Sequence, residues 1–168
     1  FVDKLLDHSL GYDHVLYCMD NETNGEEAWS RYWAEYIKEQ ALRRGRQVQV
    51  TEMWGDWRLT GAEHRRTFDH PELFDFVEVS QNTHKSGQRQ WDDLAAARAY
   101  LGGQPRPMNT VKVYGAKGSA FGQTDQKGIE RFWIQLFGGS AAVRFHRPDA
   151  GLGLGDTAVA SLRAARKL

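Results

Sequence analysis

The sequence lacks the features that mark several protein classes. It contains one cysteine, Cys18, so an internal disulfide is excluded, and Cys18 is expected to be a small core residue rather than a nucleophile. Lysine plus arginine equals aspartate plus glutamate at 22 each, so no net charge attracts nucleic acid or an anionic membrane. No apolar stretch approaches the roughly 18 residues of a membrane span. We therefore expect neither nucleic acid nor membrane as a partner.

Short apolar segments and helical patterns alternate along the chain. Five strands are expected near His14 to Asp20, Val48 to Trp54, Phe76 to Asn82, Asn109 to Tyr114 and Ala141 to His146. Helices are expected over Phe1 to Leu10, Glu26 to Arg44, Gln88 to Leu101, Asp125 to Phe137 and Asp156 to Leu168. The strands start about thirty residues apart, which is the length of one strand-helix-strand unit. This alternation is typical of an α/β protein with a parallel sheet.

The strands are expected to be apolar on one face and polar on the other. The apolar face would carry Val48 and Val50, Val77 and Val79, Val111 and Val113, and Val143 and Phe145. The polar face would include Glu22, Glu78 and Lys112. Because strands of an open doubly wound sheet are covered by helices on both faces and read as continuous apolar runs, the polar face indicates a barrel interior or a cleft.

The length does not allow a complete barrel of this kind. A (β/α)8 TIM barrel usually needs about 250 residues, whereas this chain has 168. We therefore predict that residues 1–168 form a single partial (β/α) barrel domain, a fragment that covers about strands 4 to 8. The sequence opens inside a helical pattern without an initiator Met, signal peptide or first strand. The missing N-terminal half of the barrel is accordingly an expected partner.

Aromatic residues gather where strands are expected to end. Six tryptophans are present, and Trp54, Trp57 and Tyr114 lie in or just after strand ends. Aromatic rings at a rim stack well on the apolar faces of sugar rings. For Trp54 and Trp57, packing within loops is the competing interpretation.

The dipeptide Asn21-Glu22, at the end of its strand, resembles the fourth strand of clan A glycoside hydrolases. The resemblance implies a (β/α)8 fold in which Glu22 is the general acid/base and Asn21 binds a sugar hydroxyl. The strings Val50 to Trp57 and Arg144 to Pro148 also look like those of bacterial glycoside hydrolases assigned by sequence only. The competing interpretation makes Glu22 a carboxylate that stabilises a helix N-terminus.

One departure from that family concerns the second carboxyl group. Clan A enzymes carry a nucleophilic Glu at the end of strand seven, where this chain reads Thr110 to Gly115 without a carboxylate. Glycosidases normally need two carboxyl groups. The candidates are Glu52, the best placed, then Asp56 and Glu78. We expect Glu78 to lie deeper and to pair with Lys112 or Arg144, because an unpaired buried charge is costly.

Further polar residues are expected at the same mouth as substrate-binding groups: Asn82, His84, Arg144 and His146. A metal site made of His84, His146 and Glu22 is a weaker alternative, so neither metal nor cofactor is predicted. Two functions remain open: a glycosidase that uses Glu22 and Glu52, or a barrel that binds carbohydrate without cleaving it. A metal-dependent hydrolase is a third, weaker one. A glycosidase role favours an extracellular or periplasmic location.

Overall fold

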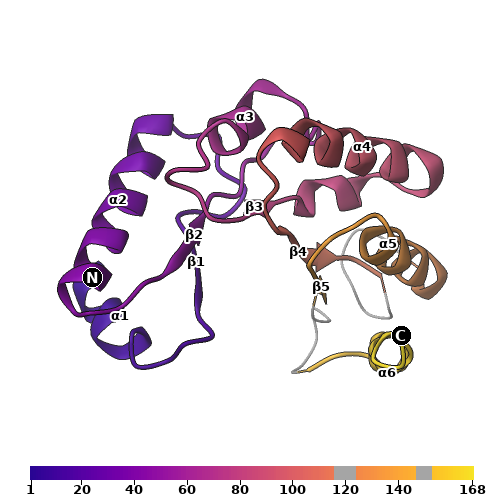
Figure 1. The fold of residues 1–168 in the computed structure, drawn as a ribbon. Coiled ribbons are helices and arrows are strands. Elements are labelled where there is room, and N and C mark those ends of the chain that lie inside the picture. Colours follow the sequence, from indigo (N-terminus) through magenta and orange to yellow (C-terminus); the bar gives the residue numbers. More distant parts are fainter. Residues whose placement is uncertain (116–123, 147–152) are drawn as a thin grey trace.

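The structure is a computed structural model that describes residues 1–115, 124–146 and 153–168. Short strands alternate with helices along the chain (Figure 1). The elements are α1 (Val2–Ser9), β1 (Leu16–Cys18), α2 (Glu27–Arg43), β2 (Gln49–Thr51), α3 (Ala62–Phe68), β3 (Val77–Glu78), η1 (Ser80–His84), α4 (Gly87–Tyr100), η2 (Leu101–Gly103), β4 (Met108–Val113), α5 (Asp125–Phe137), β5 (Ala142–Phe145) and α6 (Asp156–Ala165). The prediction of strands alternating with helices is confirmed.

The strands form two small parallel sheets rather than one. Strand β1 pairs with β2, and β3, β4 and β5 form the second sheet in that order. At the junction the Asp75 carboxylate accepts a hydrogen bond from the Val50 N–H at 2.9 Å. The Thr51 hydroxyl donates to the carbonyl of Phe76 at 2.7 Å. The backbone N–H of Asp75 also donates to Val50 O at 3.0 Å. Side-chain and backbone bonds together thus join β2 to the segment before β3, where a regular ladder is absent.

The predicted (β/α)8 TIM-barrel fragment, with strands 4 to 8 in one curved sheet, is wrong. The chain is a small α/β structure with a two-stranded and a three-stranded parallel sheet. The strands are also shorter than predicted, because β2 ends at Thr51 and β3 at Glu78. Periodicity correctly indicated parallel strands joined by helices, but it carries no information about whether neighbouring strands share one ladder.

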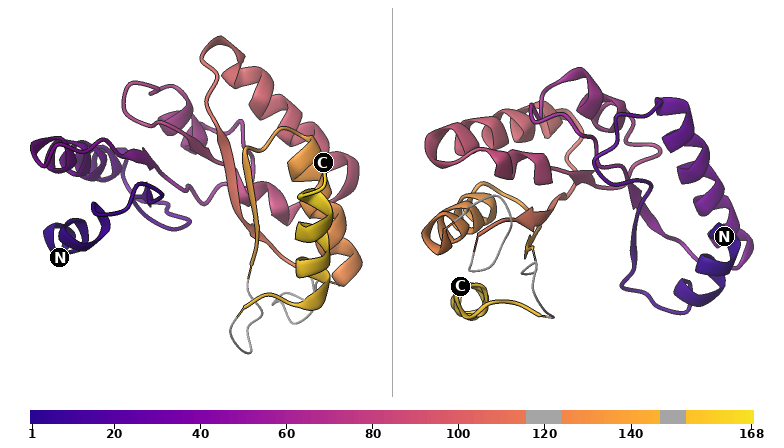
Figure 2. Two further views of the ribbon diagram at one scale, coloured as in Figure 1. Left: turned by 60° about the horizontal axis from the view of Figure 1, so that its bottom comes forward. Right: turned by 180° about the vertical axis from the view of Figure 1, so that it is seen from behind.

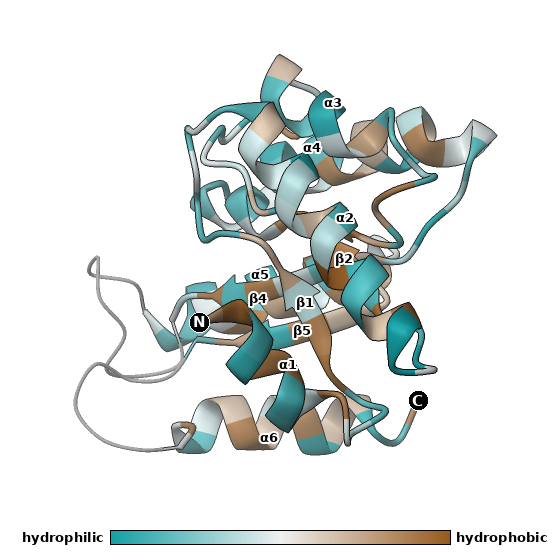
Figure 3. Cartoon of the chain, turned by 90° about the vertical axis from the view of Figure 1, so that its left-hand side faces the viewer, coloured by the Kyte–Doolittle hydropathy of each residue, from teal (hydrophilic) through white to brown (hydrophobic). Residues whose placement is uncertain are grey.

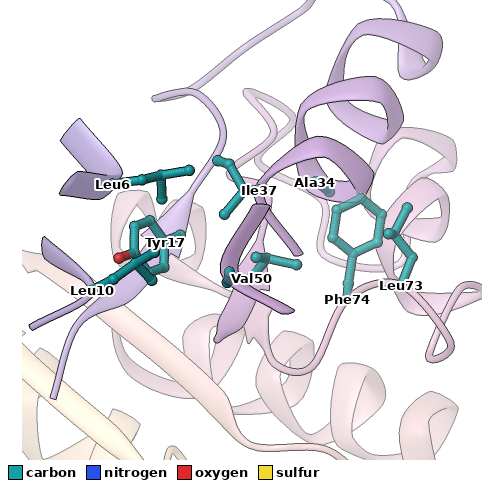
Figure 4. Packing of buried hydrophobic residues seen from close by; sticks show 9 residues of the cluster. Leu6, Leu10, Tyr17, Ala34, Ile37, Val50, Leu73 and Phe74 are labelled. Atoms are coloured by element: carbon teal, nitrogen blue, oxygen red, sulfur yellow. The ribbon is translucent and has the colours of Figure 1, made fainter. Parts of the chain in front are cut away.

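The first core cluster lies between the two-stranded sheet and the helices α1 and α2 (Figure 4). Leu6 of α1, Ile37 of α2 and Val50 of β2 meet there. Phe74, in the segment before β3, closes the same cluster and is fully buried. This packing explains why α2 forms, because its buried residues recur at helical spacing on one side: Ser30, Ala34, Ile37 and Ala41. Trp29, Tyr32 and Leu42 of the same helix are exposed.

Two further clusters lie against the three-stranded sheet. One joins β3 and β4 to α3 and α4 through residues such as Val77, Phe68 and Leu94. The other joins β4 and β5 to α5 and α6 through Val113 and Phe132. Figure 2 shows α4, α5 and α6 together on the side of the molecule away from α1 and α2. Each sheet therefore has its own helical cover.

The strand faces follow the predicted alternation for most residues. Val50, Val77, Val79, Val113 and Phe145 are buried against helices, as expected, whereas Val48, Val111 and Val143 are only half-buried. Helices α1 and α6 each carry apolar and polar residues side by side, as Figure 3 shows. In the part of the chain that the structure describes, no helix is long and apolar enough to traverse a bilayer.

Candidate functional site

The backbone makes an excursion at Asn21-Glu22, directly after β1. The N–H of Met19 donates to Thr51 O at 3.1 Å, and the N–H of Thr23 donates to Met53 O at 2.9 Å. Between these bonds the first strand advances from residue 19 to 23, whereas the second advances only from 51 to 53. The surplus residues form a bulge, and bulges are common beside active sites because they redirect side chains.

Glu22 occupies an unusual backbone conformation within this bulge. Its φ angle is 54°, and among the described residues it has no non-glycine companion at positive φ. A side chain at positive φ is uncommon outside Asn and Asp, and such a conformation costs of order 1–3 kcal/mol. Strain of this kind is concentrated at functional sites, so Glu22 is the first candidate on structural grounds as well as from the sequence.

Lys112 of β4 holds both residues of the bulge. Its Nζ donates to Asn21 Oδ1 at 2.6 Å and contacts Glu22 Oε1 at 2.8 Å. The Lys112 side chain is 11% exposed and that of Glu22 is 36% exposed, so the ion pair lies at the border between interior and solvent. Residues more than ninety positions apart thus form one cluster.

A second bulge places Lys112. Strand β4 pairs Thr110 with Val143 and Val113 with Phe145, so it has one residue more than β5 in this stretch. On the other side of β4 the Val111 N–H faces β3, which ends at Glu78, and it donates to the Ser80 hydroxyl at 2.8 Å. Ser80 therefore satisfies a backbone group of β4 that β3 no longer reaches.

The 3₁₀ turn η1 adds Gln81 and His84 to the cluster. Gln81 hydrogen-bonds to Glu22, and the charge of Glu22 acts on His84. A 3₁₀ helix has three residues per turn, so residues 81 and 84 lie on the same side of it. We call Asn21, Glu22, Gln81, His84 and Lys112 the strand-end site.

The charges in this site favour an ionised Glu22. Partial burial alone would raise the pKa of Glu22, but hydrogen bonds from Lys112 and Gln81, with the positive charge of Lys112, hold the pKa below its usual value. For His84, loss of hydration and the nearby Lys112 lower the pKa, although Glu22 opposes this shift. At neutral pH the site therefore holds a carboxylate, an ammonium group and a neutral imidazole.

Aromatic rings extend from His84 across the ends of the strands. The rings of Trp57 and His84 stack with centroids 4.4 Å apart, and those of Tyr114 and His146 stack at 4.7 Å. His84 and Tyr114, at 6.5 Å, join the two pairs. Trp57 is 58% exposed, so one of its faces is open to solvent. These four residues, the aromatic row, follow four different strands in the chain.

Glu52, predicted as the second catalytic carboxylate, does not join the strand-end site. It is 1% exposed and faces α2, where the Ser30 hydroxyl donates to its Oε2 at 2.5 Å. Its Oε1 accepts the N–H groups of Asp20 at 2.9 Å and Met53 at 2.8 Å. Burial raises the pKa of Glu52, and these hydrogen bonds partly offset that shift. Its side chain lies on the face of Val50, as alternation along the strand requires.

Two residues expected to bind substrate in this region, Trp54 and Asn82, are buried instead. Trp54 is fully buried, and its Nε1 donates to the Thr67 hydroxyl at 2.7 Å, so it packs against α3. Asn82 is buried as well and donates to Gln90 O at 2.9 Å, because the strand ends early and η1 turns this residue inward. Asp56 accepts hydrogen bonds from Arg58, which lower its pKa against the effect of burial.

Glu78 is buried beneath the site, as predicted, but with other partners. Its carboxylate accepts from the backbone N–H and the hydroxyl of Ser80 and, at 2.6 Å, from Asn109. The expected ion pair of Glu78 with Lys112 or Arg144 is wrong, since Lys112 pairs with Glu22 and Arg144 is exposed and donates to Val111 O. Burial raises the pKa of Glu78 to about 7, against the opposing effect of these hydrogen bonds.

Sequence reasoning missed the roles of Lys112 and Gln81. Lys112 was expected on the polar face of its strand, but as a partner for Glu78. Gln81 gave no signal, because a strand continuing to Asn82 would have placed it on the apolar face. Within residues 1–115, 124–146 and 153–168, no group of three His, Cys, Asp or Glu side chains is arranged to hold a metal ion.

Comparisons with known proteins do not assign the chain to a family. No protein-family model matches it, and neither a curated protein nor a solved structure does.

Proposed function

We propose that the strand-end site binds carbohydrate and that Glu22 acts there as the acid/base of glycoside hydrolysis. The observation that carries the proposal is the strained, ion-paired Glu22 beside the aromatic row. A carboxylate held in a costly conformation by a lysine 90 residues away is not required by the packing of either sheet.

The aromatic row supports carbohydrate as the ligand. Trp57 is covered by His84 on one face and is exposed elsewhere, which leaves an aromatic surface for the apolar face of a sugar ring. The neighbouring Lys112 supplies a donor, and Glu22 supplies an acceptor, for sugar hydroxyl groups, while Gln81 is buried behind them. Such a mixture of one apolar platform and several polar groups is typical of sites for small polar ligands.

Because Glu22 is ionised, it is suited to act as a general base. A carboxylate can take a proton from a water molecule whose oxygen bonds to the anomeric carbon. The glycosidic bond breaks, its electrons move to the leaving oxygen, and that oxygen takes a proton from a solvent water molecule. Glu22 then releases its proton to solvent, which balances the step. Glycosidases use a second carboxyl group for that proton, and both oxygens of Glu52 already have other partners. We therefore expect leaving groups that need no protonation to react fastest.

Binding without cleavage is the second candidate function. It is favoured because the Glu52 carboxylate already accepts hydrogen bonds within the protein and because the charge of Glu22 is paired with that of Lys112. Both functions use the aromatic row, and only hydrolysis requires Glu22 to exchange protons.

The test compares Glu22→Gln with the unchanged protein on two kinds of substrate: oligosaccharides and activated aryl glycosides. The amide keeps the shape and removes the titrating group, so turnover should fall by about 10²- to 10⁴-fold. An equal loss on both substrates indicates a base, and a larger loss on the oligosaccharide indicates an acid. Glu26→Gln, an exposed carboxylate nearby, is the matched control and should leave turnover unchanged.

Calorimetry with the same oligosaccharides separates the two candidate functions. Binding without turnover in the unchanged protein would establish the non-catalytic function. Absence of both binding and turnover across a broad set of sugars would refute the carbohydrate proposal altogether.

A further inference from the structure

We infer that Glu52 is a positioning residue that fixes the backbone path of the bulge and thereby aims Glu22 into the strand-end site. The inference rests on the proposed function of Glu22, but its structural part can be measured without any turnover. It gives Glu52 a different role from the nucleophile expected from the sequence.

The contacts of Glu52 lie at the base of the bulge. The first strand runs from residue 19 to 23 where the second runs only from Thr51 to Met53. Glu52 is the residue between Thr51 and Met53. Its Oε1 accepts from Asp20 N, on the bulged strand, and from Met53 N, on its own strand. One carboxylate oxygen therefore spans the place where the ladder opens.

The Asp20 N–H needs an acceptor that no described strand provides. The N–H of Met19 donates to Thr51 O, so the next N–H along the chain points away from the second strand, and β1 pairs with β2 alone among the described strands. A partly buried N–H group without a partner costs free energy comparable to a lost hydrogen bond. The Glu52 carboxylate removes that cost only while the chain follows the observed path. Asn21 and Glu22 follow Asp20 directly, so the direction of Glu22 depends on this bond.

The second oxygen holds the carboxylate itself in place. Ser30 of α2 donates to Oε2, and the whole side chain is buried beneath that helix. A nucleophile must reach a sugar carbon, whereas Glu52 is covered by α2 and its oxygens already have three donors. The geometry thus fits support of Glu22 and not attack on the substrate.

The role predicts different results for two substitutions. In Glu52→Gln the amide oxygen can still accept from Asp20 and Met53, and the amide nitrogen can donate to Ser30, so kcat should fall by about tenfold or less. In Glu52→Ala both backbone bonds are lost, and kcat should fall by about 100-fold with KM little changed, as for a misplaced catalytic group. Ser30→Ala should resemble Glu52→Gln.

A titration of Glu22 provides the readout that does not depend on activity. The carboxyl carbon of Glu22 is followed by NMR against pH and is assigned by its loss in Glu22→Gln. We expect the Glu22 pKa to stay depressed in Glu52→Gln and to move up towards its usual value in Glu52→Ala, because Lys112 no longer meets it. Asp75→Ala, which removes a carboxylate bond to Val50 on the same strand, is the matched control. It should leave the Glu22 pKa unchanged.

Two outcomes overturn the inference. A loss of about 10⁴-fold or more in Glu52→Gln, with the Glu22 pKa unchanged, would show that Glu52 reacts itself. If Glu52→Ala folds and the pKa of Glu22 is unchanged in it, the bulge keeps its backbone path without the Glu52 carboxylate. If Glu52→Ala does not fold, Glu52→Asp replaces it, because the shorter side chain cannot keep all three bonds. If neither the unchanged protein nor any variant hydrolyses a glycoside, the catalytic proposal is refuted. The positioning role of Glu52 is then tested by the NMR titration of Glu22 alone.

Discussion

At the scale of single residues, the ion pair between Glu22 and Lys112 is the central feature. Exposed pairs contribute little to stability, typically about 0–1 kcal/mol, and this pair is half accessible on the Glu22 side. The ion pair instead keeps Glu22 ionised and holds Glu22 in its conformation at positive φ. Sequence patterns could show that Lys112 is on the polar face of its strand, but not which carboxylate it meets.

Lys112→Met should raise the pKa of Glu22. In the unchanged protein the depressed pKa keeps Glu22 ionised as the pH falls, and without the ammonium group the proton binds at a higher pH. Any activity that needs ionised Glu22 should then be lost at a higher pH on the acid side of its profile. The measurement is the pH dependence of kcat together with the NMR titration of Glu22.

Lys4→Met is the control for that substitution, because Lys4 is exposed on α1, outside the strand-end site. If the acid side of the pH profile of kcat shifts equally in both variants, the shift is due to a general loss of positive charge and not to the contact between Lys112 and Glu22.

Trp57→Ala should weaken oligosaccharide binding by about tenfold. Aromatic stacking contributes about 0.5–1.5 kcal/mol beyond area burial, and Trp57 offers the exposed face of the aromatic row. The dissociation constant from calorimetry is the measurement. Trp91→Ala removes a partly exposed tryptophan on α4 and should leave it unchanged. Equal weakening in both variants would contradict a specific role for Trp57.

At the scale of elements, the site depends on irregularities rather than on regular strands. The bulge after β1 exposes Glu22, the bulge in β4 aims Lys112, and the 3₁₀ turn η1 presents Gln81 and His84. A regular strand in any of these places would point the side chain elsewhere, because alternation fixes its direction. These deviations explain why Asn82 and Trp54, predicted for the mouth, are buried instead.

The turn after β4 requires a glycine. Gly115 has a φ of 117°, and a Cβ atom there would lie 2.5 Å from the Cα of Gly128. Gly115→Ala should therefore lower the free energy of unfolding by about 1–3 kcal/mol. Urea denaturation checks this, with Gly102→Ala as the control, since a Cβ on Gly102 meets nothing within 4 Å. Equal stability of both variants would disprove the close approach of β4 to α5.

At the scale of the whole molecule, three clusters replace a single continuous core. One cluster belongs to the two-stranded sheet and two belong to the three-stranded sheet. The strand-end site uses residues from both sheets, since Glu22 follows β1 and Lys112 lies in β4. Its integrity therefore depends on the junction of the two sheets, where the backbone N–H of Asp75 donates to Val50 O at 3.0 Å and the Thr51 hydroxyl donates to Phe76 O at 2.7 Å.

Buried Glu78 should make stability depend on pH. Its pKa is raised from 4.5 to about 7, so the folded state binds the proton more tightly than the unfolded state. This stabilisation is fully present below pH 4.5 and is lost as the pH rises through about 7, with an upper limit of about 3 kcal/mol. The depressed pKa of Glu22 acts in the opposite direction, so its contribution is lost as the pH falls.

The difference between the unchanged protein and Glu78→Gln isolates the effect of Glu78. Free energies of unfolding in urea at pH 5 and pH 8 should show the unchanged protein losing stability relative to the variant as the pH rises. A difference that does not change with pH would mean that Glu78 titrates alike in both states.

The sequence by itself determined the order of the five strands and of the α-helices except α3, the parallel direction of the strands and the prominence of Asn21-Glu22. These follow from local periodicity and from the residues that end each strand, which act over a few positions. The tertiary structure alone decided that the strands form two sheets, that Lys112 meets Glu22 and that Glu52 faces Ser30. Such contacts join residues tens of positions apart, and bulges of one or two residues select them, so no local pattern contains them.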